Sequence, residues 1–349
     1  MHIDELETPF AAVDLDKLEA NIGRLQRYLD EHGIRNRPHI KTHKILEIAH
    51  MQIEAGAVGI SCQKLGEAEV MAQAGIRDIL VTYNIIGEAK LQRLIRLARR
   101  TRMSVTADSE FTVRGLSAAA QREKIELAVL VEFDCGGQRC GVQSPQEAAA
   151  LAQLINASAG LRFSGLMTFP SNDQTDPFVR ETREMLKGDG LEVECVSGGG
   201  TPNMWQAHTA TEVTEHRAGT YVYGDRHIVK SGAMSLDDCA LTVTTTVVSR
   251  PTADRAILDG GSKTFSSDLL DLDGYGTIIE YPEARMYAQS EEHGHVDLSA
   301  CKDKPQIGER LTVIPNHCCV VSNLFNQIYG VRRGRVEVTW PVAARGALQ

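Results

Sequence analysis

Short apolar runs alternate with amphipathic segments along the first two thirds of the chain. Eight runs of β-branched or apolar residues predict strands, near 37–41, 58–62, 78–83, 102–106, 125–132, 161–167, 191–197 and 219–222. Segments rich in Ala, Leu, Glu and Arg separate most of these runs and have apolar side chains at helical spacing. The segment 15–32 predicts a helix, because it follows a candidate N-cap at Asp14 and ends at Gly33.

Repeated strand–helix units of this kind indicate an α/β fold. Eight such units in about 220 residues suit a (β/α)8 TIM-type barrel. An open, doubly wound sheet shows the same alternation and is the structural alternative. We expect the barrel to occupy residues 14–235.

The pattern changes after about residue 236. The segments ALTVTTTVVS, DRAILDGG, ERLTVIPNH, NQIYGV and RVEVTW alternate with period two or are rich in β-branched residues. The last two flank Arg332, Arg333 and Gly334, which predicts a hairpin. Residues 236–349 therefore predict a C-terminal all-β domain, and the early run PFAAVDL leads us to add residues 1–13 to it.

Composition and charge narrow the class of partner. The net charge of −9 argues against an extended polyanion such as nucleic acid, so we expect a small-molecule ligand. No segment approaches the roughly 20 apolar residues of a membrane span, and the segment MHIDELETPF has no signal-peptide pattern. Eight scattered cysteines without a secretory signal indicate reduced thiols. We therefore expect a cytoplasmic protein that does not associate with membranes.

A barrel places its active site at the C-terminal ends of the strands. Lys41 would be the last residue of the first strand, where side-chain alternation gives it the same face as Arg37 and His39. A lysine in a partly desolvated pocket has a lowered pKa and can form a Schiff base. The alternative is an ordinary surface lysine, and we interpret His43 and Lys44 in this way, as residues at the start of a helix.

A glycine-rich segment follows the predicted seventh strand. Gly198, Gly199 and Gly200 allow backbone N–H groups to approach an anion closely, although a plain tight turn would have the same composition. Loops after strands seven and eight of such barrels often bind phosphate, which favours the binding role and adds Gly219 and Thr220. A reactive lysine together with a phosphate loop predicts pyridoxal 5'-phosphate as the cofactor.

At this point the sequence resembles a known family. The segments RPHIKTHK, GEAEVMAQAGIRDILV, GGQRCGV, SGGGTP, RAGTYVYGD, DGGSKTFSSD, SEEHG and PNHCCVVSN are similar, in this order, to those of the D-threonine aldolase and D-serine dehydratase group. These are fold-type III pyridoxal phosphate enzymes, which share their barrel with alanine racemase. The resemblance covers nearly the whole chain and implies the same fold and cofactor.

The resemblance also implies roles for individual residues. Lys41 resembles the lysine that bonds to the cofactor, and Arg139 resembles an arginine near the cofactor's phenolate oxygen. His39 is expected beneath the cofactor, and Tyr223 resembles a tyrosine near the phosphate. The residues that match the phosphate-binding loops are Ser197, Gly198, Gly199, Gly200, Gly219 and Thr220.

A second chemical feature is the segment PNHCCVV. If it forms a strand, His317 and Cys319 project from one face while Cys318 turns away. Imidazole and thiolate are zinc ligands, but two ligands alone are a weak signature and buried free cysteines are common. The family resemblance, which includes a His-x-Cys or His-x-Asp pair at this place, implies a divalent metal here: Zn, or Mn or Mg. Asp259 or the run Glu291, Glu292 and His293 would orient these ligands, or else form plain turns.

Together these features predict a pyridoxal phosphate- and metal-dependent lyase of D-3-hydroxy amino acids. Retro-aldol cleavage to glycine and an aldehyde is the first choice, and dehydration of D-serine, D-threonine or 3-hydroxy-D-aspartate is the alternative, which a cysteine at 319 favours. An amino-acid racemase or a non-catalytic cofactor-binding protein is a further alternative. The loop MTFPSN, where relatives often have a histidine, contains no ionisable side chain. The family resemblance also implies a homodimer.

Overall fold

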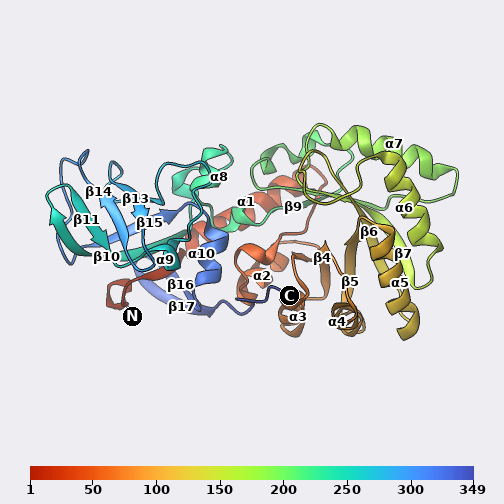
Figure 1. Cartoon of the computed structure of the whole chain (residues 1–349), viewed down its shortest axis with the longest axis horizontal. Helices are drawn as coiled ribbons and strands as arrows, with labels where there is room; N and C mark the ends of the chain where they lie inside the picture. The colour runs from red at the N-terminus through yellow and green to blue at the C-terminus, as the bar shows by residue number, and fades with distance from the viewer. The chain divides into compact units, whose positions relative to one another are not determined.

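The computed structural model describes residues 1–349 and divides them into two compact units (Figure 1). One, here called the β unit, contains residues 1–23, 42–47 and 220–346. The other, the barrel unit, contains residues 24–41, 48–219 and 347–349. The domain ranges expected from the sequence remain a prediction, and each unit is described by itself below.

The barrel unit is built on a sheet of eight parallel strands. In chain order they are β2 (Arg35–Asn36), β3 (Ile60–Cys62), β4 (Asp78–Asn84), β5 (Arg102–Ala107), β6 (Leu127–Phe133), β7 (Leu161–Thr168), β8 (Cys195–Gly199) and β9 (Glu215–Arg217). They are ordered β2-β9-β8-β7-β6-β5-β4-β3 in the sheet. A single isolated bridge, His39 to Ser61, joins the β2 and β3 edges. This curled parallel sheet confirms the predicted fold class.

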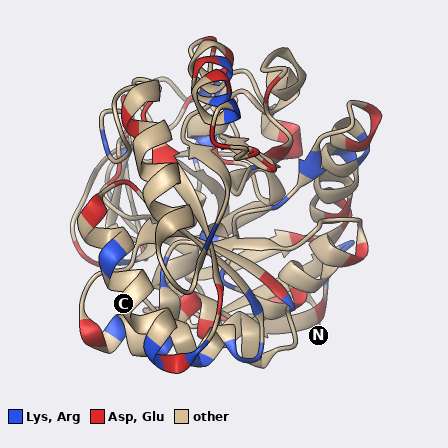
Figure 2. Ribbon diagram, turned by 90° about the vertical axis from the view of Figure 1, so that its right-hand side faces the viewer, with Lys and Arg blue, Asp and Glu red and all other residues tan.

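Helices surround this sheet (Figure 2). They are α2 (Leu46–Glu54), α3 (Leu65–Gln73), α4 (Glu88–Ala98), α5 (Glu110–Glu123), α6 (Pro145–Ala157) and α7 (Thr175–Lys187). The helix predicted at 15–32 is α1 (Leu15–Glu31), and Gly33 follows it with a positive φ of 66°. Local sequence sets the starts of α5 and α6, where the hydroxyls of Ser109 and Ser144 accept N–H groups of the first turn.

The β unit is built on a nine-stranded sheet. Its strands are β1 (Phe10–Asp14), β10 (Leu241–Thr252), β11 (Arg255–Leu258), β12 (Gly276–Ile278), β13 (Arg285–Gln289), β14 (Gly294–Asp297), β15 (Arg310–Pro315), β16 (Gln327–Arg332) and β17 (Arg335–Pro341). β1 pairs antiparallel with β10 and parallel with β16, so the early PFAAVDL run joins this sheet as predicted. The predicted hairpin is β16–β17, and short helices α8 (Arg226–Lys230), α9 (Ser262–Phe265) and α10 (Cys318–Leu324) complete the unit.

Two of the predicted strands are wrong, and both fall at candidate site residues. The segment 37–41 is not a strand: β2 ends at Asn36, and a 3-10 turn, η2 (Ile40–Thr42), contains Lys41. Likewise 219–222 is largely a 3-10 turn, η4 (Thr220–Val222), because the N–H groups of Tyr223 and Gly224 both donate to the Thr220 carbonyl. The hydrophobic pattern did not distinguish these turns from strands, because their apolar residues are buried as those of a strand are.

The predicted helix start after Lys41 also differs. His43 is fully buried, and its Nδ1 accepts the N–H of Ile45 at 3.1 Å. Lys44 has a positive φ of 55°, and the helix begins only at Leu46. No helix in either unit has the length and apolar character that crossing a membrane requires.

Candidate active site

Lys41 and Arg139 lie against the same aromatic ring. The Lys41 Nζ is 5.9 Å from the centroid of the Phe169 ring, and the Arg139 Cζ is 5.2 Å from it. Phe169 follows β7 directly and the residue is 41% exposed. Both cations therefore lie at the end of the barrel strands where the sequence predicted chemistry. The sequence did not single out Phe169, because an aromatic residue in a loop without ionisable groups has no distinctive spacing.

His39 supports the turn that carries Lys41. Its Nδ1 accepts the backbone N–H of Lys41 at 3.3 Å, and its Nε2 lies 3.2 Å from the Thr82 hydroxyl. The side chain is buried. Because both ring nitrogens are engaged, the imidazole is fixed in orientation beside Lys41.

Arg139 also approaches a buried carboxylate. Its Nη2 lies 3.8 Å from Oε1 of Glu132, a β6 residue whose side chain is almost fully buried. Burial raises the pKa of Glu132, although Arg139 opposes that shift. The Arg139 side chain is half exposed, so its guanidinium is free to meet an anionic oxygen of a ligand.

The glycine-rich segment packs tightly against neighbouring backbone. A Cβ on Gly199 would lie 2.3 Å from the Arg217 carbonyl oxygen, and Gly200 has a φ of 133°. The Gly199 N–H donates to the Ser171 hydroxyl, and the Gly200 N–H donates to the Arg217 carbonyl. Glycine at 198–200 is therefore required for strand packing, and a phosphate there would compete with these bonds.

Other phosphate donors remain available. The backbone N–H groups of Gly219, in the barrel unit, and of Thr220, in the β unit, donate no hydrogen bond within the chain. In the β unit the Tyr223 hydroxyl is fully buried and forms no hydrogen bond of standard geometry, although the buried Ser322 hydroxyl interacts with it. A buried hydroxyl without a well-formed hydrogen bond is costly, and a phosphate oxygen is a fitting acceptor for it.

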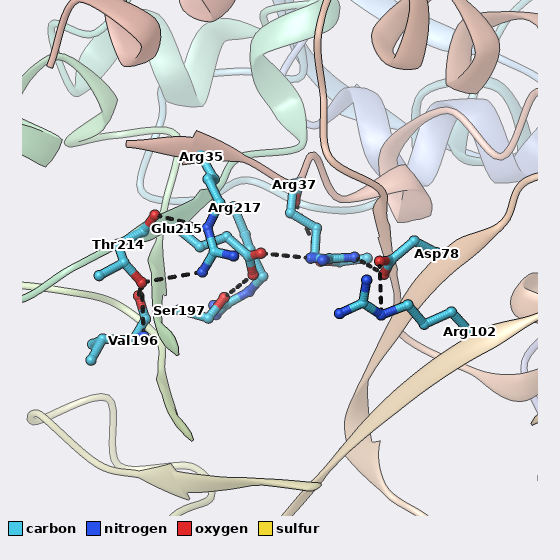
Figure 3. A network of polar contacts seen from close by, with 10 residues as sticks. Arg35, Arg37, Asp78, Arg102, Val196, Ser197, Thr214, Glu215 and Arg217 are labelled. Atoms are coloured by element: carbon cyan, nitrogen blue, oxygen red, sulfur yellow. Dashed lines mark hydrogen bonds and ion pairs between the residues drawn. The ribbon is translucent and has the colours of Figure 1, made fainter. Parts of the chain in front are cut away.

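A buried ionic network, which the sequence did not reveal, joins residues of several strands of the barrel unit (Figure 3). Glu215 accepts hydrogen bonds from Nε of Arg37 at 2.8 Å and from the Ser197 hydroxyl at 2.7 Å. Arg37 also pairs with Asp78 at 2.6 Å. Burial alone would raise the pKa of Glu215, but Arg37 outweighs it and holds that pKa below its usual value.

Arg217 completes this network. Its Nη1 donates to the Ser197 hydroxyl at 2.6 Å, and its Nη2 donates to the Thr168 carbonyl at 2.9 Å. Burial lowers the pKa of Arg217 to about 10. The Ser197 hydroxyl is thus fully used by Glu215 and Arg217. In the segment EHR, strand alternation puts residues 215 and 217 on one face of β9. This pattern could have indicated from the sequence that Glu215 and Arg217 lie in one network.

The predicted metal pair lies at the start of a helix and not on a strand. β15 ends at Pro315, His317 is the N-cap of α10, and Cys319 is the second residue of that helix. The strand assumed from the sequence is therefore wrong, because the chain turns into α10 two residues after β15. Cys318, the first residue of that helix, is fully buried.

Cys319 is surrounded by groups that stabilise a thiolate. Its Sγ lies 3.3 Å from the Thr42 hydroxyl and 3.7 Å from the Thr220 hydroxyl. The thiol of Cys318, the ring of His317 and the Thr42 hydroxyl hold the pKa of Cys319 well below its usual range despite burial. Burial lowers the pKa of His317, but the Cys319 thiolate and Asp268 outweigh it and raise that pKa to about 9.

This donor set fits a metal with open positions. Thiolate and imidazole are two ligands of the kind that Zn²⁺ accepts, and the thiolate is the ligating form. No group of three or more His, Cys, Asp or Glu side chains able to hold a metal occurs in the structure. A cation held by His317 and Cys319 would thus keep positions for water or substrate.

Comparisons with known proteins show the family of the chain. Residues 13–227 match the model described as "Alanine racemase, N-terminal domain", and residues 240–331 match "Putative serine dehydratase domain". The chain is 33% identical to a 3-hydroxy-D-aspartate aldolase of Paracoccus denitrificans, over 99% of this chain and 94% of that protein. It is 33% identical to a D-threonine aldolase of Arthrobacter, over 98% and 93%. It is 30% identical to a D-threo-3-hydroxyaspartate dehydratase of Delftia, over 96% and 97%.

Solved structures give the same picture. The D-threonine aldolase of Filomicrobium marinum superposes with a TM-score of 0.90 at 32% identity, over 99% of this chain and 97% of that one. A cysteine-to-alanine variant of a D-threo-3-hydroxyaspartate dehydratase, described as being in the metal-free form, superposes with a TM-score of 0.87 at 28% identity, with 98% of each chain covered.

Proposed function

The chain belongs to the pyridoxal phosphate-dependent family that joins an alanine racemase N-terminal domain to a serine dehydratase domain, and we propose that it cleaves D-3-hydroxy amino acids by a retro-aldol reaction. The products would be glycine and an aldehyde. The predicted family and the predicted enzyme class, a lyase, are confirmed, because the full-length relatives are aldolases and a dehydratase.

Lys41 and its neighbours would hold the cofactor. Lys41 would bond to it through Nζ, Arg139 would meet its phenolate oxygen, and Phe169 would pack beside both side chains. The N–H groups of Gly219 and Thr220 and the Tyr223 hydroxyl would be donors to its phosphate, whereas the N–H groups of Gly199 and Gly200 are already used within the barrel unit. When bound, pyridoxal phosphate supplies an electron sink for the electrons released from the Cα–Cβ bond.

His317 and Cys319 would hold the divalent metal. The observation that carries the proposal is this pair, in which a histidine faces a thiol of lowered pKa. A bound cation supplies a Lewis acid for the substrate's β-hydroxyl group. A racemase of the same fold would have no use for such a pair, since it acts only at Cα.

Dehydration is the second candidate, and one observation favours it. The metal pair contains cysteine, and the similar dehydratase is described as metal-free in a cysteine-to-alanine variant. In that reaction Lys41 would take the Cα proton at Nζ, and the hydroxyl would leave as water. We rank it second because both of the 33% identical relatives named above are aldolases.

Product analysis decides between the two reactions. The purified protein, loaded with pyridoxal phosphate and Mn²⁺ or Zn²⁺, is given D-threonine, D-serine and 3-hydroxy-D-aspartate separately. Glycine with acetaldehyde from D-threonine supports cleavage, whereas ammonia with 2-oxobutyrate supports dehydration. Production of L-allothreonine alone, the Cα epimer of D-threonine, would contradict both. Lys41→Ala serves as the control, since it should abolish turnover and the borohydride-reducible yellow colour.

Two further points belong to the proposal. We propose a homodimer, to be tested by light scattering of the purified protein. A cytoplasmic location is supported by the eight cysteines, all of which are free thiols in the structure.

A further inference from the structure

Asp268 contacts the imidazole ring of His317. Its Oδ2 lies 2.7 Å from Nδ1 of His317. The two residues are 49 positions apart, so the contact is made by tertiary structure and not by local sequence. We propose that Asp268 is the positioning residue of the metal pair, which accepts the Nδ1 proton of His317 and leaves Nε2 as the metal-binding atom.

The chemistry of histidine ligands supports this assignment. A neutral imidazole has one N–H and one lone pair, so a carboxylate that accepts the N–H determines which nitrogen can bind a metal. Metal-binding histidines commonly donate their other N–H to a carboxylate, which also fixes the ring orientation. Asp268 supplies this carboxylate within the β unit, and its side chain is 41% exposed. An oxygen atom at 2.7 Å from Nδ1 blocks that nitrogen from a metal.

The loop that carries Asp268 is itself tied to the metal pair. Asn316, which precedes His317, is buried, and its Nδ2 donates to the carbonyls of Asp268 at 3.1 Å and Gly274 at 2.9 Å. Its Oδ1 accepts a hydrogen bond from Nη1 of Arg226 at 2.7 Å. The side chain next to the histidine thus fixes the backbone of the residue that orients the histidine. This support explains how an exposed carboxylate on a loop can keep a defined position.

This inference rests on the proposed metal pair, and a metal titration tests the two separately. The protein with bound pyridoxal phosphate is stripped of metal by chelation and titrated with Co²⁺ alone. Calorimetry gives the affinity, and thiolate-to-cobalt absorption reports on Cys319. The variants are Asp268→Ala, Asp268→Asn, His317→Ala and, as a control on the same loop, Asp271→Ala, whose carboxylate makes no hydrogen bond or ion pair. Urea unfolding and the cofactor spectrum show whether each variant is folded.

We expect Asp268→Ala to weaken Co²⁺ binding by about 10- to 100-fold, as loss of such outer partners does elsewhere. Asp268→Asn should lose less Co²⁺ affinity, because its amide oxygen still accepts the Nδ1 proton. The Co²⁺ affinity of Asp271→Ala should equal that of the unaltered protein. An affinity of Asp268→Ala within twofold of the unaltered protein would overturn the role of Asp268. Equal Co²⁺ binding by His317→Ala and the unaltered protein would instead overturn the metal pair.

Discussion

The Sγ atom of Cys319 lies 3.3 Å from the hydroxyl of Thr42, the residue that follows Lys41 in the chain. The Thr42 side chain is fully buried, so no water replaces this contact if the hydroxyl is removed. When Cys319 is a thiolate, the Thr42 hydroxyl donates to it and helps to hold its pKa low.

Thr42→Val should therefore raise the pKa of Cys319 and weaken metal binding by about tenfold, the effect of one hydrogen bond to a charged group. The ultraviolet absorption of the thiolate, followed against pH in metal-free protein, measures the first effect, with Cys319→Ser as the baseline. Calorimetry with Mn²⁺ measures the second. Thr220→Val is the matched comparison: its hydroxyl is 3.7 Å from the same sulfur, so a smaller shift is expected. A larger shift of the Cys319 pKa in Thr220→Val than in Thr42→Val would contradict the stronger role assigned to Thr42.

Phe169→Leu should weaken binding of pyridoxal phosphate, because it removes the ring that packs against both Lys41 and Arg139. Two partly exposed cation–π contacts contribute about 1–2 kcal/mol together, so we expect the dissociation constant to rise between about five- and thirtyfold. Absorbance titration of the apoprotein measures it. Phe169→Tyr keeps the ring and should keep the affinity, and Phe111→Leu, at a 71% exposed ring on α5, controls for loss of a surface aromatic. Equal affinities of Phe169→Leu and Phe169→Tyr for pyridoxal phosphate would show that the aromatic ring does not contribute to cofactor binding.

Glu215→Gln should be strongly destabilising, because it leaves Arg37 and Arg217 buried without their shared carboxylate. Breaking a buried ion pair on one side costs about 3–5 kcal/mol in free energy of unfolding. The comparison is Glu123→Gln, which breaks the 2.6 Å pair with Arg99 on the exposed surface and should cost less than about 1 kcal/mol. Urea unfolding of both variants measures the difference. Similar losses in the two variants would show that the network adds no more stability than a surface pair.

His216 should make the protein less stable in mild acid. The side chain is fully buried, neither ring nitrogen has a hydrogen-bond partner, and burial lowers its pKa to about 4. Between pH 6.5 and 4 the unfolded chain therefore binds a proton that the folded chain does not, so stability falls as pH falls through this window. The loss between pH 7 and pH 5 should be about 2 kcal/mol. Urea unfolding at the two pH values measures it, and His216→Leu should reduce the pH-dependent loss by that amount. An identical loss in the variant would show that His216 does not titrate in this way.

The sequence predicted the architecture better than the local geometry of the site. Alternating strand and helix patterns, with a change of pattern near residue 236, were enough for the barrel and the β sheet. Lys41 and His317 were singled out by motif, yet each was assigned to a strand where the chain forms a turn or a helix start. Such turns are set by a few hydrogen bonds, for example from the Lys41 N–H to His39, that periodicity does not encode.

Contacts between distant segments could not be read from the chain. Carboxylates near the metal pair were expected at Asp259, Glu291 or Glu292, but Asp259 accepts hydrogen bonds from Thr8 and Thr246, and Glu292 pairs with Lys263. The carboxylate that meets His317 belongs to Asp268. Its segment was noticed only as part of a family motif, because nothing in its spacing relates it to a histidine 49 residues later.

The barrel sheet has a short junction between its two edge strands, β2 and β3, which is here called the seam. Its two edge strands contain only two and three residues, and they are joined by one bridge, His39 to Ser61, and by a hydrogen bond from the Val58 N–H to the Asn36 carbonyl at 2.9 Å, while β6 and β7 share a ladder of seven residue pairs. Backbone amides along such a short junction open and exchange with solvent sooner than those of long central ladders. Lys41 lies two residues beyond that bridge, next to this short junction of the barrel sheet. A ligand bonded to Lys41 would slow exchange there first, which makes this seam a local reporter of cofactor loading.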